Sequence, residues 1–438
     1  MKIRNRWWIL GAGLLFLCGG SGCFPSDRAA AAVQDSGEET ESQRHEDSVF
    51  ESAALEIRTD RQENDGQVEE DQREQGQAPK SVKEQVEEYI QSMTLEEKAA
   101  QLFIVFPEAL IEGVDCVTAA GETTRKAIQE IPIGGFIYLD RNLQSESQVK
   151  SMLENTQNYS MERLGLPAFL CVDEEGGSVA RIGGREEFDV PVIGDMARIG
   201  AAGDVEAARK VGEDIGTYLS RMGFNVDFAP VADVWSNPEN QVVKRRSFGA
   251  DPKLVSEMTS AVSEGLHSKG VLSVYKHFPG HGATAGDTHK GYAYTEKTEE
   301  QLKSCELIPF QRGIREKVPF IMTGHVSLPG LTGDDTPASL SPAVIGDLLR
   351  KDMGYDGIVV TDALNMGAVV QQYSSGEAAV KALKAGADIL LMPYDFKAAY
   401  RGVLEAVESG ELSRERIDES IRRILRVKIE WSSTENGR

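Results

Sequence analysis

The chain has 438 residues, a hydrophobic fraction of 40% and a formal net charge of −23. So large an acidic excess argues against nucleic-acid binding, because phosphate backbones attract basic surfaces. The five cysteines are scattered and make no disulfide framework, and we expect Cys171, which lies in an apolar run, to be buried packing.

The first 23 residues are typical of a secretory signal. Basic residues precede an apolar run from Trp7 to Cys18, which is too short for a membrane span. The run leads into the sequence SGC, which resembles a bacterial lipobox, although Gly20 stands where that pattern usually has Leu. We expect lipidation of Cys23 and anchoring of the exported protein to the outer face of the bacterial cytoplasmic membrane. Ordinary cleavage near Gly22 and an uncleaved anchor are the alternatives.

Residues 24–83 are predicted to be a disordered acidic tether. Residues 24–80 hold 16 Asp or Glu against 6 Lys or Arg, and few large apolar side chains. Such a segment cannot bury enough surface to offset its ordering entropy, and its charges repel one another and extend it.

The predicted folded domain, residues 84–432, alternates short apolar runs with amphipathic stretches. The expected strands are Leu102–Phe106, Gly135–Leu139, Ala168–Val172, Val226–Ala229, Leu272–Tyr275, Phe320–Thr323, Gly357–Thr361 and Asp388–Met392. The expected helices include Glu206–Met222, Lys253–Lys269, Thr298–Glu316, Gly376–Ala385 and Ile417–Ile429. This order predicts an α/β fold of the (β/α)8 TIM-barrel type. An open doubly wound sheet is the alternative, but no Gly-rich dinucleotide fingerprint follows the first strand.

Polar residues follow several of these strands. They are Asp173-Glu174-Glu175, Lys276-His277, His325 and Asp362. The strand ends of a barrel meet on one face, so we expect these side chains to share one cleft.

The most informative segment is KHFPGHGATAGDTH, which begins at Lys276. Its Asp287 can accept a hydrogen bond from one ring nitrogen of His289 and leave the other nitrogen free for proton transfer. A zinc site is an alternative, although the spacing fits no ligand motif and Lys276 would repel a cation. A structural loop is the other alternative, and for His281 it is the better interpretation.

These motifs together resemble glycoside hydrolase family 3, in its β-N-acetylglucosaminidase (NagZ-like) branch. The resemblance runs through LEEK from Leu95, DEEGG from Asp173, RSFG from Arg246, KHFPGHG, Asp-x-His and TDAL from Thr361. It implies a retaining mechanism in which Asp362 is the nucleophile and His289, oriented by Asp287, is the acid/base. It implies no metal and no organic cofactor.

The resemblance further implies that a group of charged residues binds the non-reducing sugar. They are Asp173, Arg181, Arg246, Lys276 and His277. Salt bridges within the barrel rim are the alternative for both arginines, and a structural role is the better interpretation of Glu174 and Glu175.

The expected function is removal of terminal β-linked GlcNAc from peptidoglycan fragments by a monomeric enzyme. A β-N-acetylglucosaminide phosphorylase using the same residues is the alternative. A non-catalytic sugar-binding lipoprotein would need a broken catalytic set. A β-glucosidase would take its acid/base carboxylate from a second α/β domain, for which we expect no room after the last helix.

Overall fold

A computed structural model describes residues 80–111, 113–286 and 293–435. The predicted signal segment, Cys23 and nearly all of the tether lie outside these residues, as do Asp287 and His289. No described helix is long and apolar enough to cross a membrane.

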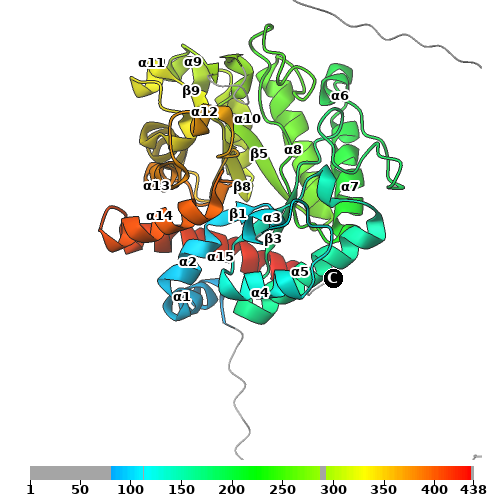
Figure 1. Ribbon diagram of the computed structural model, residues 1–438. Helices are drawn as coiled ribbons and strands as arrows, with labels where there is room; N and C mark the ends of the chain where they lie inside the picture. Colours follow the sequence, from blue (N-terminus) through cyan, green and yellow to red (C-terminus); the bar gives the residue numbers. More distant parts are fainter. Residues whose placement is uncertain (1–79, 112, 287–292, 436–438) are drawn as a thin grey trace, which may run out of the picture. The chain divides into compact units, whose positions relative to one another are not determined.

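Eight parallel strands form the barrel (Figure 1). They are β1 (Phe103–Val105), β2 (Gly135–Ile137), β3 (Phe169–Val172), β4 (Val226–Asp227), β5 (Leu272–Phe278), β8 (Phe320–Thr323), β10 (Ile358–Thr361) and β11 (Leu390–Leu391). Their order is β10-β8-β5-β4-β3-β2-β1-β11. The ring closes where the Thr361 amide donates to the Ile389 carbonyl at 3.0 Å. The predicted (β/α)8 barrel is therefore confirmed, and all eight expected strands are present.

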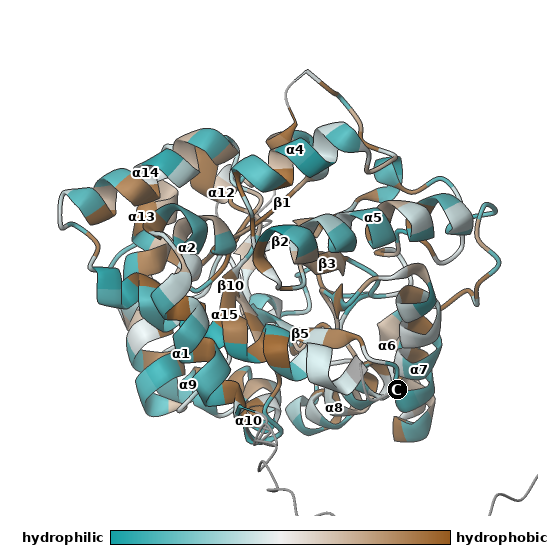
Figure 2. Ribbon diagram, turned by 90° about the horizontal axis from the view of Figure 1, so that it is seen from below, coloured by the Kyte–Doolittle hydropathy of each residue, from teal (hydrophilic) through white to brown (hydrophobic). Residues whose placement is uncertain are grey.

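Helices surround these strands (Figure 1). They are α1 (Val82–Ser92), α2 (Leu95–Gln101), α3 (Pro107–Leu110), α4 (Glu122–Glu130), α5 (Glu146–Leu164), α6 (Met196–Ala202), α7 (Val205–Met222), α8 (Pro252–Ser268), α9 (Glu299–Lys303), α10 (Leu307–Arg315), α11 (Pro329–Thr332), α12 (Gly367–Val370), α13 (Ser375–Ala385), α14 (Phe396–Glu408) and α15 (Arg414–Glu435), with a π-type helix at Ala343–Asp352. The first and last helices extend beyond residues 84–432 at both ends. The outer faces of helices such as α4 and α5 are largely hydrophilic, whereas the central strands are hydrophobic (Figure 2).

The prediction of one continuous helix at Thr298–Glu316 is wrong, because the chain forms two helices there, α9 and α10. Pro309 has no amide hydrogen, and in a continuous helix its ring would clash with the carbonyl of Cys305. Pro309 therefore sits in the first turn of a new helix, where a proline is tolerated. Glu306 at the junction is fully buried and accepts a hydrogen bond from the Ser236 hydroxyl at 2.6 Å.

The C-terminal helix α15 crosses the amino ends of the strands (Figure 2). Its Lys428 is fully buried there, and the ammonium donates to Gln101 Oε1 at 2.8 Å and to the Gly134 carbonyl at 2.9 Å. The same nitrogen lies 4.9 Å from the centroid of the Phe169 ring. Burial lowers the pKa of Lys428 to about 7, because an ammonium loses its hydration inside the protein.

Candidate active site

The carboxyl ends of β3 and β5 bring together a cluster of buried charges. Glu175 accepts two hydrogen bonds from the Arg246 guanidinium, both at 2.7 Å, and forms an ion pair with Lys276 Nζ at 2.6 Å. Lys276 Nζ also pairs with Asp173 Oδ1 at 2.9 Å. Burial alone would raise the pKa of Glu175, but the charges of Arg246 and Lys276 hold it well below its usual range. Three predicted sugar-binding residues are thus assembled around a carboxylate for which we expected a structural role.

A bulge in β5 presents two consecutive side chains to this cluster. Lys276 pairs with Met322 of β8, but Phe278 pairs with the next residue, Thr323, so that His277 is an extra residue in the ladder. Neighbouring side chains of a regular strand point to opposite faces, and a bulge re-aims them locally. Arg246 Nη2 lies 3.4 Å from His277 Nε2, so both residues reach the same site.

Asp233, which sequence reasoning did not single out, fixes the orientation of His277. The carboxylate is fully buried, and its Oδ2 lies 2.7 Å from His277 Nδ1. Its Oδ1 accepts from the backbone amides of His277 at 3.2 Å and His281 at 2.6 Å. An anion beside Nδ1 holds a proton on that nitrogen and leaves Nε2 directed at the cluster. The available signal was an aspartate inside the apolar run Ala229–Val234, where a carboxylate is buried only with dedicated donors.

Asp362 follows β10 and joins this site. Its backbone amide donates to the Thr323 carbonyl at 2.8 Å, and its Oδ1 accepts from the Ala363 amide at 2.8 Å. Burial alone would raise the pKa of Asp362, but the positive potentials of His277 and His325, the Ala363 amide and Lys276 lower it to about 2. The carboxylate is therefore ionised at neutral pH, as a nucleophile must be.

His325, at the end of β8, supports the turn that carries Asp362. Its Nε2 lies 2.9 Å from the Ala363 carbonyl, and its Nδ1 lies 2.7 Å from the Ser339 hydroxyl. Because a carbonyl only accepts, Nε2 is the donor in the first contact. We predicted that His325, at this strand end, would reach the common cleft. Its hydrogen bond to Ala363, the residue after Asp362, gives His325 a positioning role.

Arg181 lies on the loop that follows β3. The carboxylate of Glu174 organises this loop by accepting from the amides of Arg181 at 2.6 Å, Ile182 at 3.0 Å and Gly183 at 2.7 Å. The Arg181 Nε is buried without a hydrogen-bond partner among the described residues. A buried guanidinium nitrogen without a partner is costly, which is the situation expected of a group that waits for a ligand.

A small sheet is formed by the strands that precede and follow residues 287–292 in the sequence. Strands β6 (Ala285–Gly286) and β7 (Ala293–Tyr294) pair antiparallel on either side of residues 287–292, and β7 pairs with β9 (Val326–Ser327), which follows β8. The roles predicted for Asp287 and His289 concern side chains outside the described residues. Strand β6 follows β5 in the sequence, and β7 pairs with β9 just after the carboxyl end of β8.

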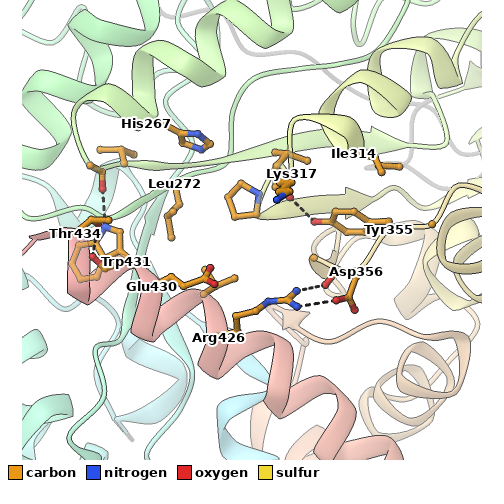
Figure 3. A pocket seen from close by; sticks show the side chains of 17 residues that line it. His267, Leu272, Ile314, Lys317, Tyr355, Asp356, Arg426, Glu430, Trp431 and Thr434 are labelled. Carbon is orange, nitrogen blue, oxygen red and sulfur yellow. Dashed lines mark hydrogen bonds and ion pairs between the residues drawn. The ribbon is translucent and has the colours of Figure 1, made fainter. Parts of the chain in front are cut away.

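A cavity of about 640 Å³ lies at the opposite end of the strands (Figure 3). Leu272 at the start of β5 and Tyr355 before β10 line it, together with Trp431 of α15. The ion pair between Arg426 and Asp356, at 2.8 Å, borders the same space. Since barrel enzymes place their chemistry at the carboxyl ends of the strands, we do not assign this cavity to the reaction.

A (β/α)8 barrel with an ionised aspartate and clustered cations at its strand ends has the architecture of a barrel enzyme acting on a polar substrate. The chain belongs to glycoside hydrolase family 3, because the Glycosyl hydrolase family 3 N terminal domain matches residues 94–427.

Similar proteins are named as beta-hexosaminidases or as a β-N-acetylglucosaminidase. Beta-hexosaminidase LpqI of Mycobacterium tuberculosis is 36% identical over 271 residues, which are 60% of this chain and 68% of that protein. Beta-hexosaminidase A of Pseudoalteromonas piscicida is 34% identical over 326 residues, 69% of this chain and 54% of the relative. The solved family 3 β-N-acetylglucosaminidase from Paenibacillus sp. str. FPU-7 superposes with a TM-score of 0.73 at 39% identity, covering 78% of this chain and 64% of that one. The chain thus spans less than two thirds of the last two relatives.

Proposed function

We propose that this protein is an exo-acting, retaining β-N-acetylglucosaminidase that removes terminal β-linked GlcNAc, with peptidoglycan fragments as its natural substrate. The observation that carries the proposal is the position of Asp362 at the end of β10, where its backbone amide is held by the Thr323 carbonyl and its carboxylate accepts from the Ala363 amide. Two relatives named as beta-hexosaminidases and a solved β-N-acetylglucosaminidase of the same family support the choice of sugar.

In the proposed mechanism, Asp362 attacks the anomeric carbon and a covalent glycosyl-enzyme forms. His289 protonates the departing oxygen, and later removes a proton from the attacking water, while Asp287 orients the imidazole. Each step leaves the total charge of the site unchanged, because the Asp362 carboxylate is consumed as the His289 imidazolium gives up its proton. Attack of water then breaks the bond between Asp362 and the sugar and restores both charges.

The charge cluster and Arg181 are proposed to bind the non-reducing sugar. Charged donors and acceptors that hydrogen-bond hydroxyl and acetamido groups contribute about 1.5–3 kcal/mol each. The buried Arg181 Nε, which has no partner among the described side chains, has a donor to offer such a sugar. Lys276 and Arg246 retain their charge in this site because nearby carboxylates, Glu175 above all for Arg246, raise their pKa values despite burial.

The test is a panel of aryl β-glycosides, assayed with and without phosphate. Aryl β-GlcNAc should be cleaved at least about tenfold better than aryl β-glucoside, because a glucoside leaves groups meant for the acetamido group unpaired. Release of free GlcNAc in phosphate buffer supports the hydrolase. Release of GlcNAc-1-phosphate identifies a phosphorylase, and a preference for glucose removes the proposed specificity.

For its location, we propose export and a lipid anchor at Cys23, with the acidic tether holding the barrel away from the membrane. The support is the basic start, the short apolar run and the SGC sequence. Incorporation of labelled fatty acid into the wild type, and none into Cys23→Ala, is the expected result.

A further inference from the structure

Two exposed tyrosines lie in segments that follow strands of the barrel near the proposed site. Among the residues that the structure describes, six such side chains are exposed: Val114, Met161, Val192, Tyr294, Val370 and Tyr394. Val192, Tyr294 and Tyr394 lie between the carboxyl end of a barrel strand and the next α-helix, whereas Val114 follows α3, Val370 ends α12 and Met161 lies on α5. Single exposed apolar residues need no explanation, but Tyr294 and Tyr394 are large aromatic side chains that are exposed in segments close to the strand ends of the proposed site.

The two tyrosines stand on either side of the strand that leads to Asp362. Tyr294 is on β7, whose partner β9 directly follows β8, and Tyr394 lies between β11 and α14. Strands β8 and β11 are the two neighbours of β10 in the barrel. Both tyrosines therefore follow strands that flank the one leading to Asp362, at the same end of the barrel.

The loop that presents Tyr394 is short and sharply turned. Only four residues separate Leu391 of β11 from Phe396 of α14, so Tyr394 cannot lie far from the end of the barrel. Met392 has φ 45°, a conformation that is uncommon outside glycine and that turns the chain straight after the strand. The Tyr394 ring is 77% exposed, so it contributes almost nothing to the core.

We propose that Tyr294 and Tyr394 form a binding platform for the second and third sugars of an oligosaccharide substrate, on the leaving-group side. The proposal rests on the proposed glucosaminidase activity. An exo-acting site encloses the terminal sugar, so the rest of the chain must leave across the mouth of the barrel. Each pyranose ring has an apolar face of C–H groups, and burying that face on a tyrosine ring removes apolar surface from water without requiring a charged partner.

The experiment compares substrates that differ only on the leaving-group side. The β-1,4-linked GlcNAc trimer offers two sugars to the platform, whereas N-acetyl-β-glucosaminyl fluoride offers none. Tyr394→Ala and Tyr294→Ala should each lower kcat/KM for the trimer by about two- to tenfold, the range of a single ring contact. On the fluoride both variants should stay within about twofold of the wild type. Tyr394→Phe should keep the trimer activity, because the ring face and not the hydroxyl makes the contact.

Met161→Ala is the matched control, since it removes an exposed apolar side chain from a helix outside this face. It should change neither substrate. Unchanged trimer hydrolysis in Tyr394→Ala and Tyr294→Ala, or equal losses on trimer and fluoride, would overturn the platform. A wild-type enzyme that cleaves neither the fluoride nor aryl β-GlcNAc would instead refute the proposed function, so the two failures are distinguishable.

Discussion

Asp233→Asn tests whether a buried carboxylate sets the chemistry of His277. The asparagine is nearly the same size, and its Oδ1 can still accept from the backbone amides of His277 and His281, so the loop is expected to keep its shape. Its Nδ2 is a donor, however, and cannot accept the proton that His277 Nδ1 directs at Asp233 Oδ2 across 2.7 Å. If the proton moves to Nε2, the Nδ1 of the imidazole can accept a hydrogen bond from this Nδ2. The proton on Nε2 then faces the Arg246 guanidinium at 3.4 Å.

The magnitude follows from the kind of contact that is lost. A hydrogen bond to a charged group contributes about 1.5–3 kcal/mol, which corresponds to about ten- to a hundredfold in kcat/KM if His277 holds the bound sugar in the transition state. Proton relocation also changes Nε2 from acceptor to donor, so the loss should appear with every substrate that carries the same terminal sugar.

The assay is kcat/KM on aryl β-GlcNAc, with thermal unfolding of each variant to show that it is folded. Asp251→Asn is the matched control, because Asp251 caps α8 through the Lys253 amide at 3.0 Å and asparagine caps a helix equally well. A folded Asp233→Asn variant within twofold of the wild type would refute the reasoning.

Three further outcomes are expected. Asp362→Asn should abolish turnover with an unchanged circular dichroism spectrum, and a 2-fluoro sugar inactivator should label Asp362 in peptide maps of the wild type; a label elsewhere contradicts the assignment. His289→Ala should cost about 10²–10⁴ in rate on substrates with poor leaving groups and less on good ones, and equal losses across a leaving-group series would rule it out as the acid. Because the pKa of Lys428 falls from 10.5 to about 7 on folding, the unfolded chain binds more protons between these values, and the free energy of unfolding should rise with pH across that window. Urea unfolding at pH 7 and pH 9.5 should show this rise in the wild type and a smaller one in Lys428→Met; identical pH dependence in both would show that Lys428 keeps its proton when buried.

The barrel could be predicted because its strands are buried on both sides. The sequences of parallel strands covered by helices are short, continuous apolar runs. In this chain, charged and amphipathic stretches of helical length separate these runs. The break between α9 and α10 was missed because the hydrophobic period continues through it. Only the stereochemistry of Pro309, and not the pattern, interrupts the helix.

Only part of the site could be predicted from the sequence. Asp173, Lys276, His277 and Asp362 stand at strand ends, where barrel topology alone brings them together. The contacts that tune them depend on residues whose role needs three dimensions. Glu175 binds Arg246 across 71 residues of sequence, and although both residues stand in recognisable motifs, neither motif indicates that the two side chains pair.

The first and last elements of the domain are neighbours in space. Helix α1 packs on α15, and β1 pairs with β11. During synthesis the amino-terminal part of the chain appears first, so most strands of the barrel can pair before β11 exists. The free edge of β1 has no partner until β11 and α15 have been made. During that interval the unpaired edge of β1 can form hydrogen bonds with strands of other chains. Synthesis of β11 and α15 thus becomes the event that seals the domain, which makes removal of α15 far more damaging than its length suggests.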